Sequence, residues 1–404
     1  MTGLPLSGLR VADFSWVHAG PFGTSLLGEL GAEVIKVETS KRLDIIRRLP
    51  PMADRVAGIN RSGYFNSINR GKRSCTLDLS TAEGVALAKQ LVRVSDLVVE
   101  NFSPGTFDRL GLGYLALREV RPDIILVSIS GYGATGPDRE YVAYGPSLTA
   151  FSGLVALNGY PGGEPQSMNL AWPDPVAGYT AAFAALAALH HRDVSGEGQW
   201  IDLAQAETQI AFLGDEITET TLNGRQPVRR GNQEVGASPH GIYRCAGDDH
   251  WIAISVTDRE SWLGLRRALG ASSLDDVTLD DPFERWNRRD EIDAIVEAWT
   301  RTRSADEGFH WLQAHGVPAA PAATFAELAE DPHLAERGFF GIDDHPEAGP
   351  RQLPGLPWRF ASVPHRRMGT PAPRFGEGNE AVFGDLLGLG QAALANLIER
   401  KVIV

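Results

Sequence analysis

The sequence predicts an α/β protein whose large domain is doubly wound around a parallel sheet. In the first third of the chain, short apolar runs alternate with amphipathic helical segments, which is the rhythm of repeated βαβ units. Several of these runs are apolar almost throughout, as expected for strands that are buried on both faces. The chain has 404 residues, of which 43% are hydrophobic, so it is long enough for a substantial core and for two domains.

The elements of the large domain follow one another in a regular order. A strand is expected at residues 9–14 and a helix at 21–30; Gly31 ends this helix, and the next strand is expected at 34–37. The later expected elements are strands at 75–79, 97–100, 124–129 and 199–203, and helices at 81–94 and 176–189.

A second domain is expected after about residue 224, where the pattern changes. The polar, glycine-containing loop 231–241 precedes a strand at 251–255 and a helix around 292–300. Proline-bearing stretches then lead to a final helix at 391–400. We therefore expect a Rossmann-like large domain begun by residues 1–223, a smaller α+β domain of residues 224–325, and a return segment, 326–404, that completes the large domain.

Composition and charge exclude several classes of function. The formal net charge of −13 argues against nonspecific binding to nucleic acid or to an anionic membrane. The N-terminus lacks the basic and apolar regions of a signal peptide, and no apolar stretch approaches the length of a bilayer span, so a cytoplasmic protein is expected. Cys75 and Cys245 have no CxxC neighbour and are interpreted as packed thiols.

Residues Gly131 to Gly136 fit the GxGxxG pattern of dinucleotide-binding sites, but their context does not. Pro137 follows directly where a long apolar helix would be needed, so we interpret the segment as a glycine turn that lines a cleft. HExxH, paired CxxC, Walker A and GxSxG motifs are absent from the sequence. We expect neither a metal site nor a permanently bound cofactor.

Asp174 is the leading candidate for a catalytic residue. It stands between Pro173 and Pro175 directly before a helix, which predicts an N-cap with an ionised carboxylate at the positive end of the helix. Such a carboxylate can attack an activated acyl carbon without a neighbouring base. A purely structural helix cap is the alternative, and the local pattern alone favours it.

Several blocks along the chain carry a family resemblance. They are residues 11–14, 19–21 and 30–38, then 69–74, 100–105 with 109–111, 130–133, 196–199 with 201–202, 316–321 and 331–339. In this order they resemble the class III coenzyme A transferases, the group that contains formyl-CoA:oxalate transferase, carnitine CoA-transferase and α-methylacyl-CoA racemase. Asp174 falls where the transferases of the family place their nucleophilic aspartate.

The resemblance implies transfer of CoA between carboxylic acids, with an acyl-CoA as substrate and succinyl-CoA as a plausible donor. Asp174 would form an aspartyl mixed anhydride and then an aspartyl-CoA thioester. Backbone N–H groups of the turn at Tyr132 and Gly133, or of the 231–241 loop around Gly236, are candidate oxyanion donors. His18 would lie in the segment that opens the active site. Tyr144, Trp16 and Trp172 would shape the acyl pocket, although aromatic residues also commonly fill cores.

The resemblance also implies a set of CoA-binding residues and a mode of assembly. The residues at the matching positions are Val17, Lys72, Arg73, Asn101, Phe102 and Arg109. Cationic side chains suit the phosphates of CoA, whereas on pattern alone Lys72 and Arg73 read as a solvated turn between strands. Relatives form interlocked dimers, so a homodimer is expected.

Two alternatives remain at this point. A racemase of this family needs two proton-transfer groups, commonly including a His that the segment Tyr144-Gly145-Pro146-Ser147 does not contain. A noncatalytic acyl-CoA-binding relative would keep the cationic residues but would not exchange acyl groups.

Overall fold

A computed structural model describes residues 3–361 and 369–404, which form two compact units. The first unit consists of Met1–Val155, Ser167–Arg225 and Pro332–Val404, and the second of Ala156–Gln166 and Gln226–Asp331. The second unit therefore includes a short segment, Ala156–Gln166, that the sequence analysis assigned to the large domain. Arg229 holds this segment through hydrogen bonds to the carbonyl oxygens of Ala156 and Gly163, each 3.0 Å long.

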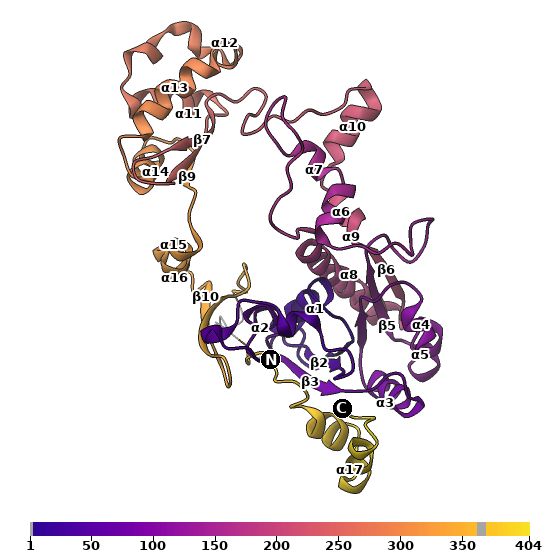
Figure 1. The fold of residues 1–404 in the computed structure, drawn as a ribbon. Helices are drawn as coiled ribbons and strands as arrows, with labels where there is room; N and C mark the ends of the chain where they lie inside the picture. Colours follow the sequence, from indigo (N-terminus) through magenta and orange to yellow (C-terminus); the bar gives the residue numbers. More distant parts are fainter. Residues whose placement is uncertain (1–2, 362–368) are drawn as a thin grey trace. The chain divides into compact units, whose positions relative to one another are not determined.

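A parallel six-stranded sheet organises the first unit (Figure 1). Its strands are β1 (Arg10–Asp13), β2 (Glu33–Glu38), β3 (Lys72–Thr76), β4 (Leu97–Glu100), β5 (Ile125–Ser130) and β6 (Trp200–Ala204). They lie in the order β3-β2-β1-β4-β5-β6, which is the order of doubly wound α/β folds. In such folds ligands bind beyond the carboxyl ends of the strands at the point where the strand order reverses. In this sheet the order reverses between β1 and β4.

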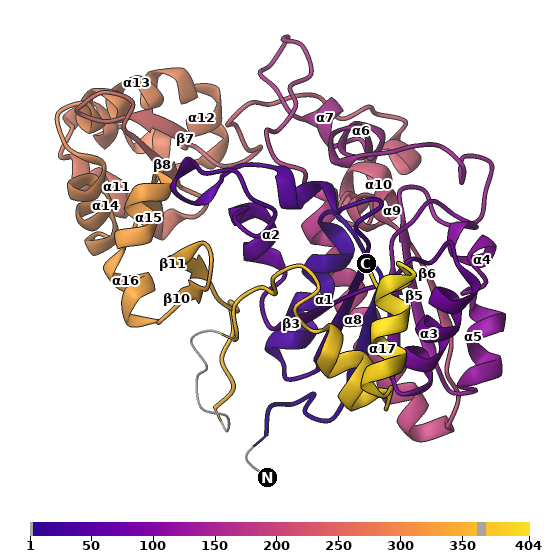
Figure 2. The same ribbon diagram turned by 60° about the horizontal axis from the view of Figure 1, so that its bottom comes forward.

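Helices cover both faces of this sheet. On one face, α1 (Ala19–Glu29) and α8 (Pro173–Ser195) bury Leu26, Leu27 and a row of alanines against the strands. On the other face lie α3 (Ala82–Arg93), α5 (Tyr114–Val120) and α17 (Gln391–Glu399), and the last core residues of the chain, Val402 and Ile403, pack there too. Figure 2 shows α17 beside the sheet.

The close approach of α1 and α8 depends on two glycines. A Cβ atom on Gly23 would stand 2.8 Å from the carbonyl oxygen of Gly178, and one on Gly178 would stand 2.9 Å from the carbonyl oxygen of Ala19. Larger residues would force the two helices apart. This contact fixes the start of α8, and therefore Asp174, relative to the segment that precedes α1.

Shorter elements complete the first unit. They are α2 (Gly63–Ile68), α4 (Thr106–Arg109), α6 (Gly145–Phe151), α9 (Gln205–Ile210), α10 (Gly214–Asn223), α16 (Pro332–Glu336) and the antiparallel hairpin of β10 (Phe340–His345) and β11 (Gly349–Pro354); α7 (Leu154–Leu157) leads into the second unit. Hydrogen bonds connect the C-terminal part of the chain to β3. The Asn379 side chain accepts from the Thr76 backbone N–H and donates to the Thr76 hydroxyl oxygen.

The second unit packs helices against a small antiparallel sheet. The sheet consists of β7 (His240–Arg244), β8 (Trp251–Ser255) and β9 (Ala319–Pro321), and the helices are α11 (Arg259–Leu269), α12 (Pro282–Asn287), α13 (Arg289–Thr300), α14 (Ala305–Ala314) and α15 (Phe325–Glu330). Trp262 is fully buried at the centre of its core.

Two predicted elements differ from the observed ones in ways that bear on function. The strand expected at 75–79 is β3 at Lys72–Thr76, because Lys72 already pairs in register with Val34 of β2. Lys72 and Arg73 therefore lie within the sheet and not in a turn. The helix expected at 176–189 is longer and runs from Pro173 to Ser195. None of the helices in the two described stretches, 3–361 and 369–404, has the length and apolar character to cross a bilayer.

Candidate active site

Asp174 lies in the first turn of α8, which begins at Pro173. The N-cap residue is Trp172, and the Asp174 backbone N–H donates to the carbonyl oxygen of Ala171 at 3.1 Å. The sequence analysis placed Asp174 itself at the N-cap, and this was wrong because the helix starts at Pro173, two residues earlier than that assignment requires. The carboxylate is still at the positive end of the helix, where the backbone dipoles favour negative charge.

Two residues from distant parts of the chain contact the Asp174 carboxylate. The Gln205 side chain, at the start of α9 directly after β6, donates to Oδ1 at 3.2 Å. Gly145 at the start of α6 faces the other oxygen, since a Cβ atom there would lie 3.1 Å from Oδ2 and 2.5 Å from the Cβ of Ala171. A larger residue at 145 would therefore displace the carboxylate.

Burial dominates the electrostatics of Asp174. Desolvation raises the pKa of its carboxyl above the ordinary value, and the hydrogen bond from Gln205 opposes this shift. The sequence analysis expected only stabilisation of the charge. A carboxylate with a raised pKa holds its proton more strongly and is the stronger nucleophile once ionised.

His18 and Tyr64 form a pair near this carboxylate. Nδ1 of His18 lies 2.8 Å from the Tyr64 hydroxyl oxygen. Burial lowers the pKa of His18 to about 4, so its imidazole is neutral at pH 7. Burial, with the negative charges of Asp174 and Asp44, raises the pKa of Tyr64 to about 12, so the phenol also remains neutral. The structure thus pairs the predicted His18 with Tyr64, a tyrosine that the sequence analysis missed and whose pKa responds to the charge of Asp174.

The chain between β1 and α1 is held in a strained conformation. Val17 has a φ of 61°, which is costly for a β-branched residue. Its N–H points to the Asp44 carboxylate, with N···O distances of 3.2 and 3.3 Å. The Asn101 side-chain amide makes two hydrogen bonds to Trp16, the residue before Val17. It accepts from the Trp16 N–H and donates to the Trp16 carbonyl oxygen, both at 2.7 Å. Asn101 thus shapes this loop, which suits a functional segment.

Lys72 is buried and fully engaged within the protein. Its side chain is 0% exposed, and Nζ donates to Asp13 Oδ2 at 2.9 Å, to the Pro21 carbonyl oxygen at 2.8 Å and to Asn69 Oδ1 at 2.9 Å. Desolvation lowers its pKa to about 8. An ammonium group has three donors, so none is left for a phosphate. The prediction that Lys72 binds CoA directly is therefore corrected: its geometry is that of a buried partner of Asp13.

Arg73 points the other way from the sheet. Its side chain is 56% exposed, and Nε lies 3.6 Å from Glu33 Oε1. The difference in burial between Lys72 and Arg73 follows from their adjacent positions in β3, because successive side chains of a strand project to opposite faces.

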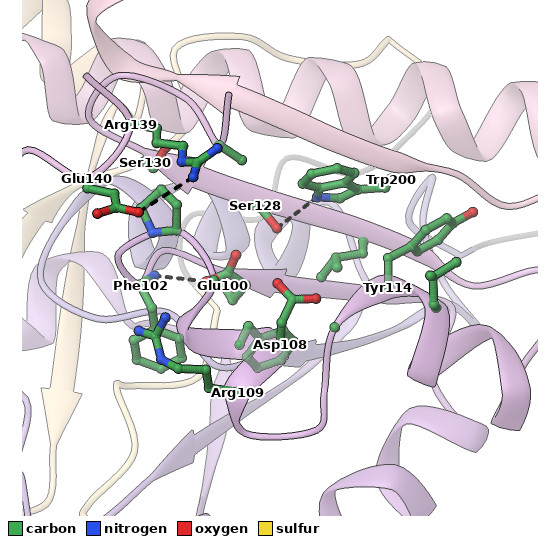
Figure 3. Close-up of a pocket in the computed structure, with 17 residues that line it drawn as sticks. Glu100, Phe102, Asp108, Arg109, Tyr114, Ser128, Ser130, Arg139, Glu140 and Trp200 are labelled. Carbon is green, nitrogen blue, oxygen red and sulfur yellow. Dashed lines mark hydrogen bonds and ion pairs between the residues drawn. The ribbon is translucent and has the colours of Figure 1, made fainter. Parts of the chain in front are cut away.

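A cavity of about 550 Å³ lies along β5 and beyond the end of β4 (Figure 3). Phe102 and Arg109, both predicted to bind CoA, line it together with Arg139. The exposed Arg109 guanidinium is steadied by a 2.8 Å hydrogen bond to the Thr106 hydroxyl. Burial raises the pKa of Glu100, at the floor of the cavity, to about 7. Aromatic and guanidinium groups in one cavity suit a nucleotide that carries phosphates.

The other predicted residues lie in several places. The Tyr132 ring packs edge-on against Phe151 with a centroid distance of 5.0 Å, and Tyr132 and Gly133 line a separate cavity of about 360 Å³. The side chain of Tyr144 is exposed at the N-terminus of α6. Gly236 belongs to the second compact unit.

Sequence reasoning missed Tyr64, Gln205 and the contact role of Gly145. Gln205 carried a weak signal, because it directly follows a strand of a parallel sheet, where ligand-binding groups gather. Tyr64 carried none, since nothing near it in the sequence indicates that it would meet His18.

Comparison with known proteins identifies the family of the chain. The family model described as CoA-transferase family III matches residues 6–379. The succinyl-CoA–D-citramalate CoA-transferase of Chloroflexus aurantiacus is 35% identical over 401 residues, which cover 99% of this chain and 98% of that protein. The succinate–glutarate CoA-transferase of Agrobacterium fabrum is 34% identical over 387 residues, or 95% of this chain and 96% of that one.

Solved structures lead to the same assignment. The crystal structure of a CaiB/BaiF family protein from Brucella suis matches with a TM-score of 0.85 and 30% sequence identity, and the match covers 95% of this chain and 100% of that one. The chain therefore belongs to CoA-transferase family III, and it is a class III CoA-transferase.

Proposed function

We propose that the enzyme moves CoA from succinyl-CoA to a second carboxylic acid, with Asp174 as the nucleophile. The observation that carries this proposal is the half-buried Asp174 carboxylate, with one oxygen held by Gln205 and the other beside Gly145. The choice of donor is supported by the similar enzymes named above, which act on succinyl-CoA or succinate.

The reaction proceeds through two kinds of covalent intermediate. A carboxylate oxygen of Asp174 attacks the thioester carbon of succinyl-CoA, the carbon–sulfur bond breaks, and a mixed anhydride and CoA thiolate form. The thiolate attacks the side-chain carbonyl carbon of Asp174, which releases succinate and leaves an aspartyl-CoA thioester. The acceptor carboxylate then attacks that carbon, and the thiolate returns to the acceptor acyl group. The new acyl-CoA leaves and the Asp174 carboxylate is regenerated without ATP.

Each tetrahedral intermediate needs donors for its oxyanion. Tyr64 is suited to this role because its phenol stays protonated and its pKa responds to the charge of Asp174. In the tautomer in which His18 carries its proton on Nδ1, the Tyr64 hydroxyl accepts from His18 and keeps its own proton free to donate. The backbone N–H groups of Tyr132 and Gly133 remain further candidates.

For CoA, we assign Phe102, Arg109 and Arg139 in the cavity along β5 to the nucleotide, with Arg73 as an additional exposed cation. Val17 and Asn101 contribute by shaping the loop before α1. Lys72 acts as a positioning residue that anchors Asp13, and Asp13 in turn accepts from the Ser15 backbone N–H at 3.0 Å in the same loop.

We further propose that the protein acts as an interlocked homodimer in the cytoplasm. Support for the compartment comes from Cys75 and Cys245, which are both free and buried, as expected in reducing surroundings. The dimer rests on the resemblance to relatives that interlock.

A mass-spectrometric screen tests the proposed function. Purified enzyme is incubated with succinyl-CoA and, one at a time, a panel of dicarboxylic and hydroxycarboxylic acids. New acyl-CoA masses that appear with an equal amount of free succinate are expected. Hydrolysis of succinyl-CoA without a new ester across the whole panel would contradict the choice of donor.

A further inference from the structure

The hairpin of β10 and β11 reverses the usual alternation of a half-buried sheet. Such strands normally turn apolar side chains inward and polar ones to solvent. Along β10, Asp343 and His345 are buried, whereas Ile342, directly before Asp343, is 64% exposed. The inner face of this hairpin is therefore polar, which is costly unless something satisfies it.

This face lies against the segment that leads into α2. Asn60 donates to the Glu347 carboxylate at 2.9 Å, Arg351 donates to Asp54 at 2.8 Å, and Arg61 donates to the Glu347 carbonyl oxygen. Between the two segments lies a cavity of about 460 Å³ that residues from both sides line. Its volume is within the range of small-molecule sites and is many times the roughly 30 Å³ of one water molecule.

Two hydrogen-bond donors at this cavity have fixed positions and no acceptor in the part of the chain that the structure describes. The Arg61 guanidinium is pinned through its terminal nitrogens to Glu347, Ala53 and Asp54, but its buried Nε–H has no partner in residues 3–361 or 369–404. His345 accepts at Nδ1 from the backbone N–H groups of Glu347 and Ala348, at 3.1 and 3.0 Å. The ring proton must therefore sit on Nε2, which is also buried and without a partner in the described chain.

Two acceptors complete the set. The Asn66 amide nitrogen donates to the Asn60 carbonyl oxygen at 3.2 Å, which fixes its orientation and leaves Oδ1 as a buried acceptor. Asp343 Oδ1 is buried as well, and neither oxygen has a hydrogen-bond partner among the described residues. Burial also raises the pKa of Asp343. Four orphaned polar groups at one cavity are unusual in a folded protein and call for a ligand.

We propose that this cavity binds a small hydroxycarboxylic acid, with its carboxylate on Arg61 and His345 and its hydroxyl on Asn66 and Asp343. A carboxylate supplies acceptors for the two donors, and the positive charge of Arg61 favours it. A hydroxyl supplies the donor that the two oxygens lack. A plain carboxylic acid would satisfy only the first pair.

This site is separate from the Asp174 carboxylate but adjoins its surroundings. Asp174 is not among the described residues that line the cavity, whereas Tyr64, the partner of His18, is. The binding itself does not depend on transfer through Asp174, so the two proposals can fail separately.

Calorimetric titration of the full-length enzyme, without any CoA ester, tests the proposal. The probes are D-malate and L-malate, with succinate as the matched acid that lacks the hydroxyl. At least one malate enantiomer is expected to bind tenfold or more tightly than succinate, since a site built for a hydroxyl rejects the analogue without it. Equal binding of all three acids, or binding of none, would overturn the proposal.

Variants locate the site. His345→Phe and Asn66→Leu should each weaken malate binding at least tenfold, whereas Asp344→Asn, which changes an exposed residue of the same strand, should not. Unchanged malate affinity in His345→Phe and Asn66→Leu would place the acid elsewhere and refute the assignment. Circular dichroism checks that both variants fold. If either does not, a crystal structure of the unmodified enzyme with saturating malate decides: density between Arg61 and His345 is expected, and an empty cavity overturns the proposal.

Discussion

The Gln205 amide nitrogen lies 3.2 Å from Oδ1 of Asp174, and this contact joins the end of β6 to the start of α8. It holds one oxygen of the carboxylate by a neutral donor and leaves Oδ2 beside Gly145. The Gln205 contact thereby fixes the orientation of the Asp174 carboxylate through a neutral group. In the proposed mechanism, this arrangement favours attack by Oδ2.

Replacement of Asp174 by Asn or Ala should abolish transfer, because neither side chain can form the mixed anhydride. Circular dichroism should show a folded protein, since the residue is only half-buried. Hydroxylamine added together with succinyl-CoA should convert Asp174 to a hydroxamate, detectable by peptide mass spectrometry. An active Asp174→Ala enzyme, or a hydroxamate on another residue, would refute the mechanism.

Transfer should be lost at low pH with an acid limb above the ordinary aspartate pKa of about 3.9, because burial raises the pKa of Asp174 and only the ionised form attacks. The hydrogen bond from Gln205 lowers that pKa, so its removal in Gln205→Leu should move the limb to higher pH and reduce kcat by about tenfold. The pH dependence of kcat/KM for both enzymes measures this. A limb that stays in place would show that Gln205 does not act on the carboxylate.

Lys72 and Arg73, though adjacent, should respond in opposite ways. Lys72→Met leaves Asp13 buried without its cation and should lower the free energy of unfolding by about 3 to 5 kcal/mol. Arg73→Ala removes an exposed side chain and should change stability by less than about 0.5 kcal/mol while it weakens binding of free CoA. Urea unfolding and calorimetry with CoA separate the two effects. A stable Lys72→Met protein with weakened CoA binding would instead indicate that Lys72 binds CoA directly.

The sequence predicts the alternation of strands and helices well because each element carries its own periodicity, and the position of Asp174 follows from its local motif. Burial does not follow from such patterns. Lys72 looked like a surface cation because two of its buried partners lie far from it in the sequence. Asp13 in β1 and Pro21 in α1 reach its ammonium group only once the sheet and α1 have assembled. Likewise, the contact between Tyr64 and His18 joins residues that are 46 positions apart in the sequence. The sequence of β10 also does not indicate that its polar residues, and not Ile342, are the buried ones.

The proposed interlocked dimer should persist on dilution to nanomolar concentration, because intertwined chains bury far more area than transient partners. Sedimentation velocity at decreasing concentrations measures this. A folded monomer at any of these concentrations would contradict the proposed assembly.

Isotope uptake should distinguish acyl transfer from racemisation. Racemisation breaks the bond between the α-carbon and its hydrogen, which requires a protonated acid and a free base on opposite sides. In this enzyme Gly145 occupies the segment where racemases of the family commonly carry a His, and His18, with a pKa of about 4, is not protonated at pH 7. In deuterium oxide, with a chiral 2-methylacyl-CoA or with succinyl-CoA and an acceptor acid, the recovered and newly formed esters should therefore contain no α-deuterium. Mass spectrometry of both esters measures this, and rapid α-deuteration without a new ester would establish a racemase instead.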